Sequence, residues 1–108
     1  MKKYEIRRVD AEVALKDRKM IEPGMAQQYN IEKSGNGDTD LIASYDSIEE
    51  AKADLKNRKS SVRLTSSFSS KYYLVEEYFI EENEYDEDGE WINGGDIWEY
   101  SEMEFKEV

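Results

Sequence analysis

Carboxylates dominate the residues of this sequence that could do chemistry. The stretch EEYFIEENEYDEDGEW, from Glu76 to Trp91, contains nine Asp or Glu residues and no Lys or Arg. Such residues can act as paired acids and bases, bind a hard cation, or present negative charge to a basic partner. The sequence has no Cys and no His, which excludes thiolate nucleophiles, imidazole bases and the commonest zinc ligands. Three uses of the carboxylates therefore remain.

Catalysis is the least favoured of the three. Hydrolysis by paired carboxylates needs two acids that flank one cleft. Glu81 and Glu82 are adjacent in the sequence, and adjacent side chains of a strand point to opposite faces. A chain of 108 residues also leaves little room for a substrate pocket. We therefore expect no enzymatic activity, no catalytic residues and no cofactor.

A cation site is suggested by Glu84, Asp86, Asp88 and Gly89, whose spacing resembles the start of an EF-hand loop. The twelfth position of such a loop needs a bidentate Glu, but here it is Gly95. The flanking residues also have strand patterns in place of helices. We expect a solvated turn and no metal site, with a calcium site as the alternative.

The negative charge is concentrated in the last third of the sequence. Residues 1–75 contain 12 acidic and 14 basic residues, whereas residues 76–108 contain 14 acidic residues and Lys106 as the one basic residue. The formal net charge of −11 therefore comes from the last third of the chain, which produces a local negative field and not a uniformly acidic surface. A basic block directly precedes the acidic one and consists of Lys56, Arg58, Lys59, Arg63 and Lys71.

Alternation of apolar and polar residues predicts the strands that carry these groups. The predicted strands are Lys3–Val9, Met25–Lys33, Asp40–Tyr45, Lys71–Glu84 and Ile97–Phe105. The second and third are expected to form a hairpin. Apolar residues on both faces of the fourth indicate a central strand, and we expect it to pair with the fifth in an acidic hairpin spanning residues 72–105. In the fifth, alternation places Trp98 and Tyr100 on one side.

The strongest helix signal is SIEEAKADLKNRK, in which Ser47 and Glu50 form a capping box and predict a helix over residues 48–59. Asp10 suggests a short helix after the first strand, and the residues from Glu22 to Met25 suggest a type II turn. The Ser-rich segment 60–70 indicates a loop or weak edge strand. The sequence thus predicts a single α+β domain over residues 1–108, with an antiparallel sheet of about five strands and one main helix packed on one face.

Charge density and aromatic content favour recognition of a basic partner. A net charge of −13 over a hairpin roughly 30 to 40 Å long gives about one charge per 3 Å, close to that of one nucleic-acid strand. Ten of the 13 aromatic residues lie from Phe68 onward, among the carboxylates. We predict that this surface occupies the nucleic-acid site of a basic protein. The predicted contact residues are Glu76, Glu77, Glu81, Glu82, Glu84, Tyr85, Asp86, Glu87, Asp88, Glu90 and Trp91.

The stretches SIEEAKADL and YYLVEEYFIEENEYDEDGEW, together with the small size and the lack of Cys, resemble accessory proteins of phages and mobile elements in Gram-positive bacteria. This group includes anti-CRISPR inhibitors, several of which are DNA mimics. The resemblance implies a non-enzymatic inhibitor that occupies the cleft in which a Cas nuclease recognises duplex DNA. It carries no residue-by-residue correspondence.

Two other interpretations remain open. The protein could be a stand-alone interaction or regulatory domain whose acidity is a solvated face, or whose hairpin pairs with its own basic block at residues 56–71. It could instead bind nucleic acid through that basic block, although the neighbouring negative charge would repel such a ligand.

No apolar run reaches the roughly 18 residues that cross a bilayer. The N-terminal residues MKKYEIRRVD contain no apolar stretch after their positive charges. We therefore expect a soluble, unexported, cytoplasmic protein with no membrane partner.

Overall fold

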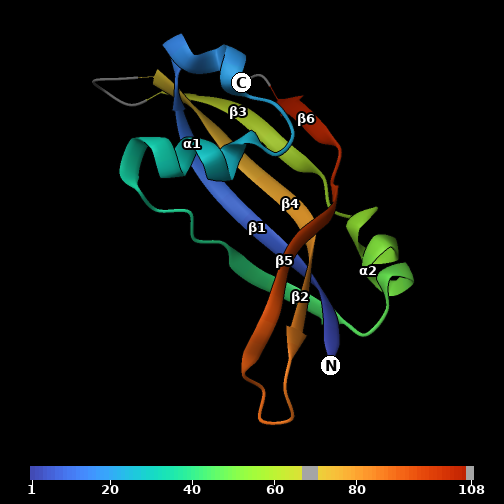
Figure 1. Ribbon diagram of the computed structural model, residues 1–108. Coiled ribbons are helices and arrows are strands. Elements are labelled where there is room, and N and C mark those ends of the chain that lie inside the picture. Colours follow the sequence, from blue (N-terminus) through green and yellow to red (C-terminus); the bar gives the residue numbers. More distant parts are fainter. Residues whose placement is uncertain (67–70, 107–108) are drawn as a thin grey trace.

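The computed structural model describes residues 1–66 and 71–106, and within them it has an α+β fold built on a mixed sheet of six strands (Figure 1). The strands are β1 (Lys2–Ala14), β2 (Asp40–Tyr45), β3 (Ser60–Ser66), β4 (Lys71–Tyr85), β5 (Trp91–Tyr100) and β6 (Met103–Lys106). The helices are the 3₁₀ helix η1 (Leu15–Met20), α1 (Met25–Ser34) and α2 (Ile48–Leu55). The strand order is β2-β1-β4-β3-β6, and β5 pairs with β4.

The centre of the sheet is β4, as its two apolar faces predict. One edge of β4 pairs antiparallel with β1, from Ala14 opposite Tyr72 to Lys2 opposite Glu84. The other edge is shared by two strands, because β3 pairs with residues 71–76 and β5 with residues 79–85. The predicted hairpin between the two C-terminal segments is confirmed for β4 and β5.

The sheet is mixed, which corrects the prediction of an antiparallel sheet of about five strands. After Tyr100 the chain leaves β4, and Ser101 donates its backbone N–H to the Tyr78 carbonyl at 2.9 Å. The chain then crosses to the outer edge of β3, where β6 pairs parallel to it. The buried hydroxyls of Ser60 and Ser101 are hydrogen-bonded to each other at this crossing. The predicted strand Ile97–Phe105 is therefore two strands that lie against different neighbours.

The predicted strand Met25–Lys33 is wrong, because these residues form α1. The preceding turn is of type II as predicted, with φ 89° and ψ −3° at Gly24. The helix buries Ala26 and Tyr29, three residues apart, so the apparent alternation in this segment is incidental. Gly35 ends α1 in the left-handed conformation. Since this segment is helical, the predicted hairpin with Asp40–Tyr45 does not form, and β2 pairs with β1 instead.

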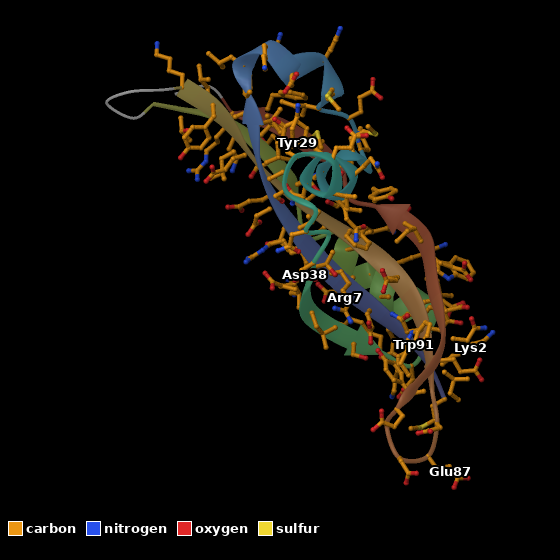
Figure 2. The ribbon with its side chains drawn as sticks, turned by 60° about the vertical axis from the view of Figure 1, so that its left-hand side comes forward. Lys2, Arg7, Tyr29, Asp38, Glu87 and Trp91 are labelled. Atoms are coloured by element: carbon orange, nitrogen blue, oxygen red, sulfur yellow. The ribbon has the colours of Figure 1, made fainter. Side chains whose placement is uncertain are left out.

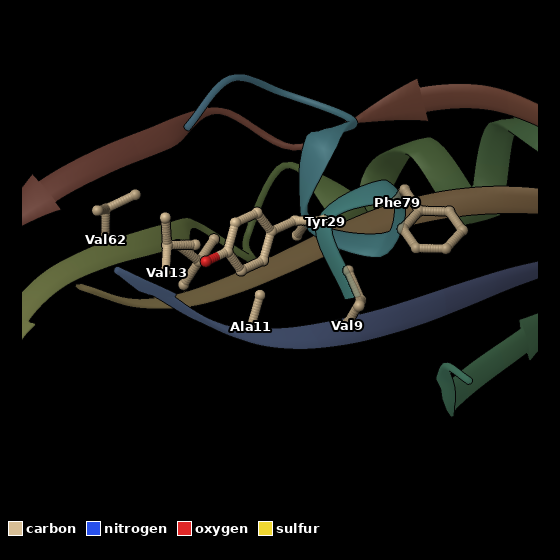
Figure 3. Close-up of a cluster of buried hydrophobic side chains, with 8 residues drawn as sticks. Val9, Ala11, Val13, Tyr29, Val62 and Phe79 are labelled. Carbon is tan, nitrogen blue, oxygen red and sulfur yellow. The ribbon is translucent and has the colours of Figure 1, made fainter. Parts of the chain in front are cut away.

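The predicted helix after Asp10 is also wrong, because β1 continues to Ala14. Val9, Ala11 and Val13 alternate at strand spacing, and each is at most 3% exposed. They form one core with Tyr29 of α1, Val62 of β3 and Phe79 of β4 (Figure 3). Burial of this apolar row outweighs the N-cap preference of Asp10.

The opposite face of the sheet packs on α2. Ile6 and Ile80 of the sheet contact Ala51 and Leu55 of the helix. Ser47 is confirmed as the N-cap, since its hydroxyl accepts a hydrogen bond from the Glu50 backbone N–H at 3.2 Å, while the Glu50 carboxylate accepts from the Ser47 hydroxyl at 3.0 Å. The helix ends at Leu55 and not at residue 59.

The Ser-rich segment forms β3, which lies between β4 and β6 in place of the predicted loop or edge strand; residues 67–70 lie outside the described part of the chain. In β3, Val62 is 2% exposed. Among the helices of the described residues, none is long and apolar enough to span a membrane.

Candidate partner-binding surface

The turn at the end of the β4–β5 hairpin carries four carboxylates in residues 86–90 and lies at one end of the molecule (Figure 1). Asp86 organises this turn, because its Oδ1 accepts hydrogen bonds of 2.9 Å from the backbone N–H groups of Asp88 and Glu90. Glu87, Asp88 and Glu90 are exposed, and Glu87 is at the far end of the hairpin in Figure 2. We call residues Asp86–Glu90 the acidic tip.

A second group of carboxylates lies on the face of the sheet that packs on α2. Glu82 and Glu84 are on the same side of β4 as Ile80. The register places Asp96 opposite Glu82 and Glu99 opposite Ile80, so these side chains of β5 share that side. We call Glu82, Glu84, Asp96 and Glu99 the acidic face.

The acidic tip and the acidic face have no ion-pair partner within residues 1–66 and 71–106. The salt bridges in that part of the chain involve other acids, such as Glu102 with Lys59 and Asp54 with Arg58. The basic block thus contacts Glu102, beyond β5, and leaves the hairpin carboxylates unneutralised. Lys2, which lies opposite Glu84 in the β1–β4 register, is exposed.

The other face of the hairpin holds a polar network centred on Glu5, which is 3% exposed. The Glu5 carboxylate accepts hydrogen bonds from Arg7 (2.7 Å), from the Asn83 amide (2.9 Å) and from the Tyr85 hydroxyl (2.5 Å). The Asn83 amide also donates to Glu81 at 2.8 Å. The hydrogen bond to Glu5 raises the pKa of Tyr85. Each polar group of this buried network has a partner, so the network attaches β4 to β1.

Two tryptophans extend from β5 on opposite faces of the sheet. The Trp91 indole N–H donates to the side-chain Oδ1 of Asn83 at 2.9 Å, and the Trp98 indole N–H donates to the Glu82 carboxylate at 3.3 Å. Trp98 also packs edge-on against Tyr4, with 6.0 Å between ring centroids, and lies beneath the Lys52 ammonium. Trp91 is 58% exposed and Trp98 is 48% exposed.

The bulges of β5 explain why Trp98 and Tyr100 are on opposite faces, which corrects the expectation that they share one side. The register shifts between Ile80 and Glu81, and Trp98 is the extra residue in β5. Tyr100 packs on Phe79, with 5.7 Å between ring centroids. Two further shifts leave Gly95 and Ile92 unpaired. Strand alternation read from sequence does not anticipate such bulges.

The predicted contact residues separate into distinct environments. Glu77 is 1% exposed and accepts a hydrogen bond from the Gly24 N–H at 2.9 Å, so it is not part of the surface. Burial raises the pKa of Glu77, although the N–H groups of Gly24 and Ala26 favour its ionised form. Glu76 lies between Asp10 and Ser61 in mid-sheet, and Glu81 and Tyr85 belong to the Glu5 network. The residues brought together in the acidic tip and the acidic face are Glu82, Glu84, Asp86, Glu87, Asp88 and Glu90, whereas Trp91 follows the tip on the opposite face of the sheet.

Sequence reasoning missed the part of this surface that β5 contributes. Asp96, Glu99 and Trp98 complete the acidic face, and Ile92 and Ile97 of the same strand are also exposed. The composition of residues 91–100 could have indicated this exposed surface. A strand with large apolar residues at successive positions cannot bury all of them against one neighbour.

No group of three or more acidic side chains in the described part of the chain is arranged to hold a metal ion. In the segment that resembles an EF-hand loop, Asp86 Oδ1 instead accepts hydrogen bonds from the backbone of its own turn. Comparisons of the chain with protein-family models, with curated proteins and with solved structures found no match.

Proposed function

We propose that the protein is a non-enzymatic inhibitor whose hairpin occupies the nucleic-acid site of a basic protein. The observation that carries this proposal is the set of eight carboxylates in the acidic tip and acidic face, beside exposed tryptophans and with no salt bridge from the described residues. Like charges held this close repel one another. A basic partner would remove that repulsion on binding.

The partner class follows from the two kinds of group on the surface. Carboxylates can replace phosphates in contacts with Lys and Arg, and exposed indoles can replace bases in contacts with flat apolar side chains. A Cas nuclease is the first candidate, because the small size, the lack of Cys and the acidic C-terminal stretch resemble those of phage and mobile-element accessory proteins, a group that includes anti-CRISPR inhibitors. The second candidate, an interaction domain with a solvated acidic face, predicts no role for these carboxylates in binding.

The experiment is a pull-down with the tagged protein from a bacterial lysate that contains guide-loaded and guide-free Cas nucleases, at about 0.15 M salt. The proposal predicts capture of a basic nucleic-acid-binding protein and its loss when excess DNA is added. The test variant changes Glu87, Asp88 and Glu90 to Lys, because none of these exposed carboxylates makes a hydrogen bond within the described chain. It should capture at least about tenfold less.

A matched control separates position from net charge. Changing the exposed Glu12, Glu22 and Glu32 to Lys alters the net charge equally, but at residues outside the hairpin. This control should bind like the unmodified protein. Equal capture by both variants, or capture that DNA leaves unchanged, would reject the proposed function in favour of a solvated acidic face.

A further inference from the structure

The two tryptophans of β5 present their apolar surfaces outward. Each indole has one polar atom, and in both residues it is hydrogen-bonded inward to a side chain of β4, Asn83 or Glu82. The hydrogen bonds fix the orientation of the rings, and the half-exposed remainder is hydrocarbon. Rings held in this way lose little conformational entropy when they bind a flat apolar group.

Because Trp91 and Trp98 lie on opposite faces, a flat partner surface cannot contact both. A partner that contacts both must enclose the edge formed by β5, which pairs with no strand of the described chain except β4. The free edge is a poor template for an added strand, because bulges at Ile92, Gly95 and Trp98 interrupt its ladder. A second copy of the chain would bring like charge to the acidic face. The geometry therefore favours contact by side chains within a groove of another protein.

The chemistry of that groove follows from the residues it would meet. The unneutralised acidic face requires Lys and Arg, and the fixed indoles require aromatic or apolar platforms. Basic grooves with aromatic platforms are typical of proteins that bind single-stranded nucleic acid, in which bases stack on the platforms. The edge of a sheet is also narrow, because the thickness of one sheet is about 10 Å, the distance at which sheets pack. Such an edge suits a narrow groove. We propose that the partner's site binds a single strand of nucleic acid, with Trp91 and Trp98 in the positions of stacked bases. This inference rests on the proposed function.

The test is displacement from immobilised DNA. Proteins of a bacterial lysate are bound in parallel to resins carrying single-stranded DNA and duplex DNA of the same sequence, and the purified protein is added at increasing concentration. We expect release of a bound protein from the single-stranded resin at a concentration at least about tenfold below any release from the duplex resin. The W91A/W98A variant should release it at least about tenfold less well. The W91F/W98F variant should retain most of the effect, because it keeps aromatic rings.

Controls distinguish the possible failures. The L41A/F105A variant removes two exposed apolar side chains from β2 and β6 and should act like the unmodified protein. Release from the duplex resin at equal or lower concentration would overturn this inference but leave the proposed function in place. Release by W91A/W98A equal to that by the unmodified protein would also overturn the inference. Release from neither resin would overturn the proposed function with it.

Discussion

The carboxylate of Glu77, in the middle of β4, accepts a hydrogen bond of 2.9 Å from the backbone N–H of Gly24, directly before α1. The N–H groups at a helix start have no partner within the helix, and negative charge is favourable there. Gly24 also lies against Tyr100, because a Cβ at Gly24 would be 3.0 Å from the Tyr100 ring. This contact connects α1 to the end of β5.

Removing the Glu77 carboxyl should destabilise the protein. Glu77→Ala leaves the Gly24 N–H without its acceptor and should lower the free energy of unfolding by about 1 to 3 kcal/mol. Urea unfolding followed by circular dichroism measures this change. Glu76→Ala changes the adjacent and less buried residue. This control should lower the free energy of unfolding by a smaller amount. Equal losses would show that the hydrogen bond to Gly24 contributes nothing specific.

The pH dependence of Glu77 has a defined sign. Burial raises the pKa of Glu77 in the folded protein above its ordinary value of 4.5. The stability that depends on its protonated form is therefore complete below the unfolded pKa and is lost as pH rises through the folded pKa. Compared with Glu77→Gln, the unmodified protein should become relatively less stable as pH rises above 4.5 and through the raised folded pKa of Glu77. A difference of the opposite sign would contradict the raised pKa.

The pair of Asp54 and Arg58 predicts the opposite pH dependence. The hydrogen bond from Arg58, 2.8 Å long, lowers the pKa of Asp54, and the Tyr45 hydroxyl adds to this effect. Stability from this group is present above its unfolded pKa, near 3.8, and is lost as pH falls through the lower folded pKa. Asp54→Asn should lower the free energy of unfolding by roughly 0.5 to 1 kcal/mol at pH 7 and by less at pH 3. Asp46→Asn, at an exposed ion pair with Lys3, is a control with a smaller expected cost.

Asn83 is expected to control the orientation of Trp91. The residue is 3% exposed, and its side chain contacts Glu5, Glu81 and Trp91 through hydrogen bonds. Asn83→Ala should cost about 1 to 3 kcal/mol, because it leaves these buried groups without a partner. NMR should show faster solvent exchange of the Trp91 indole N–H, while that of Trp98 serves as an internal reference. Unchanged exchange at Trp91 would show that Asn83 does not hold the ring.

The close approach of β5 to β4 depends on Gly94. A Cβ at this position would be 2.6 Å from the Cα of Asn83, and the residue has φ 142°. Gly94→Ala should therefore weaken the hairpin by more than about 1 kcal/mol, with amide exchange in β5 increasing most. Gly95→Ala adds a Cβ with no atom within 4 Å, although φ is also positive there, at 95°. This control should lower the stability of the hairpin by less than Gly94→Ala does. The opposite ranking would place the constraint in backbone strain instead of close contact.

Short sequence patterns predicted the elements whose formation depends on residues close together in the chain. The capping box located the start of α2, and the apolar residues on both sides of β4 identified a central strand. Long-range packing decided the elements that were mispredicted. Residues 25–34 alternate like a strand but form α1, because Ala26 and Tyr29 pack on β1 and Gly35 ends a helix. The parallel pairing of β6 with β3 has no counterpart in the local sequence.

The candidate surface could be predicted where it is a continuous stretch of sequence. The acidic tip follows from its composition, but the acidic face depends on the register between β4 and β5. Sequence reasoning assigned Glu77 to the surface because it belongs to the acidic stretch from Glu76 to Trp91. The start of α1, which stabilises this buried carboxylate, comes from a segment more than 50 residues away along the chain.

The pairing of β1 with β4 sets the order in which the sheet can assemble. β1 contains the first residues of the chain, and its principal neighbour lies at residues 71–85. Closing so long a loop costs entropy before any cross-strand contact forms, and folds dominated by such contacts form slowly. During synthesis, β2 becomes available to β1 first, whereas the principal neighbour of β1 is made only after α2 and β3. The pairing of β1 with β4 consequently follows synthesis of β4, and the acidic hairpin forms only after β5 has also been made.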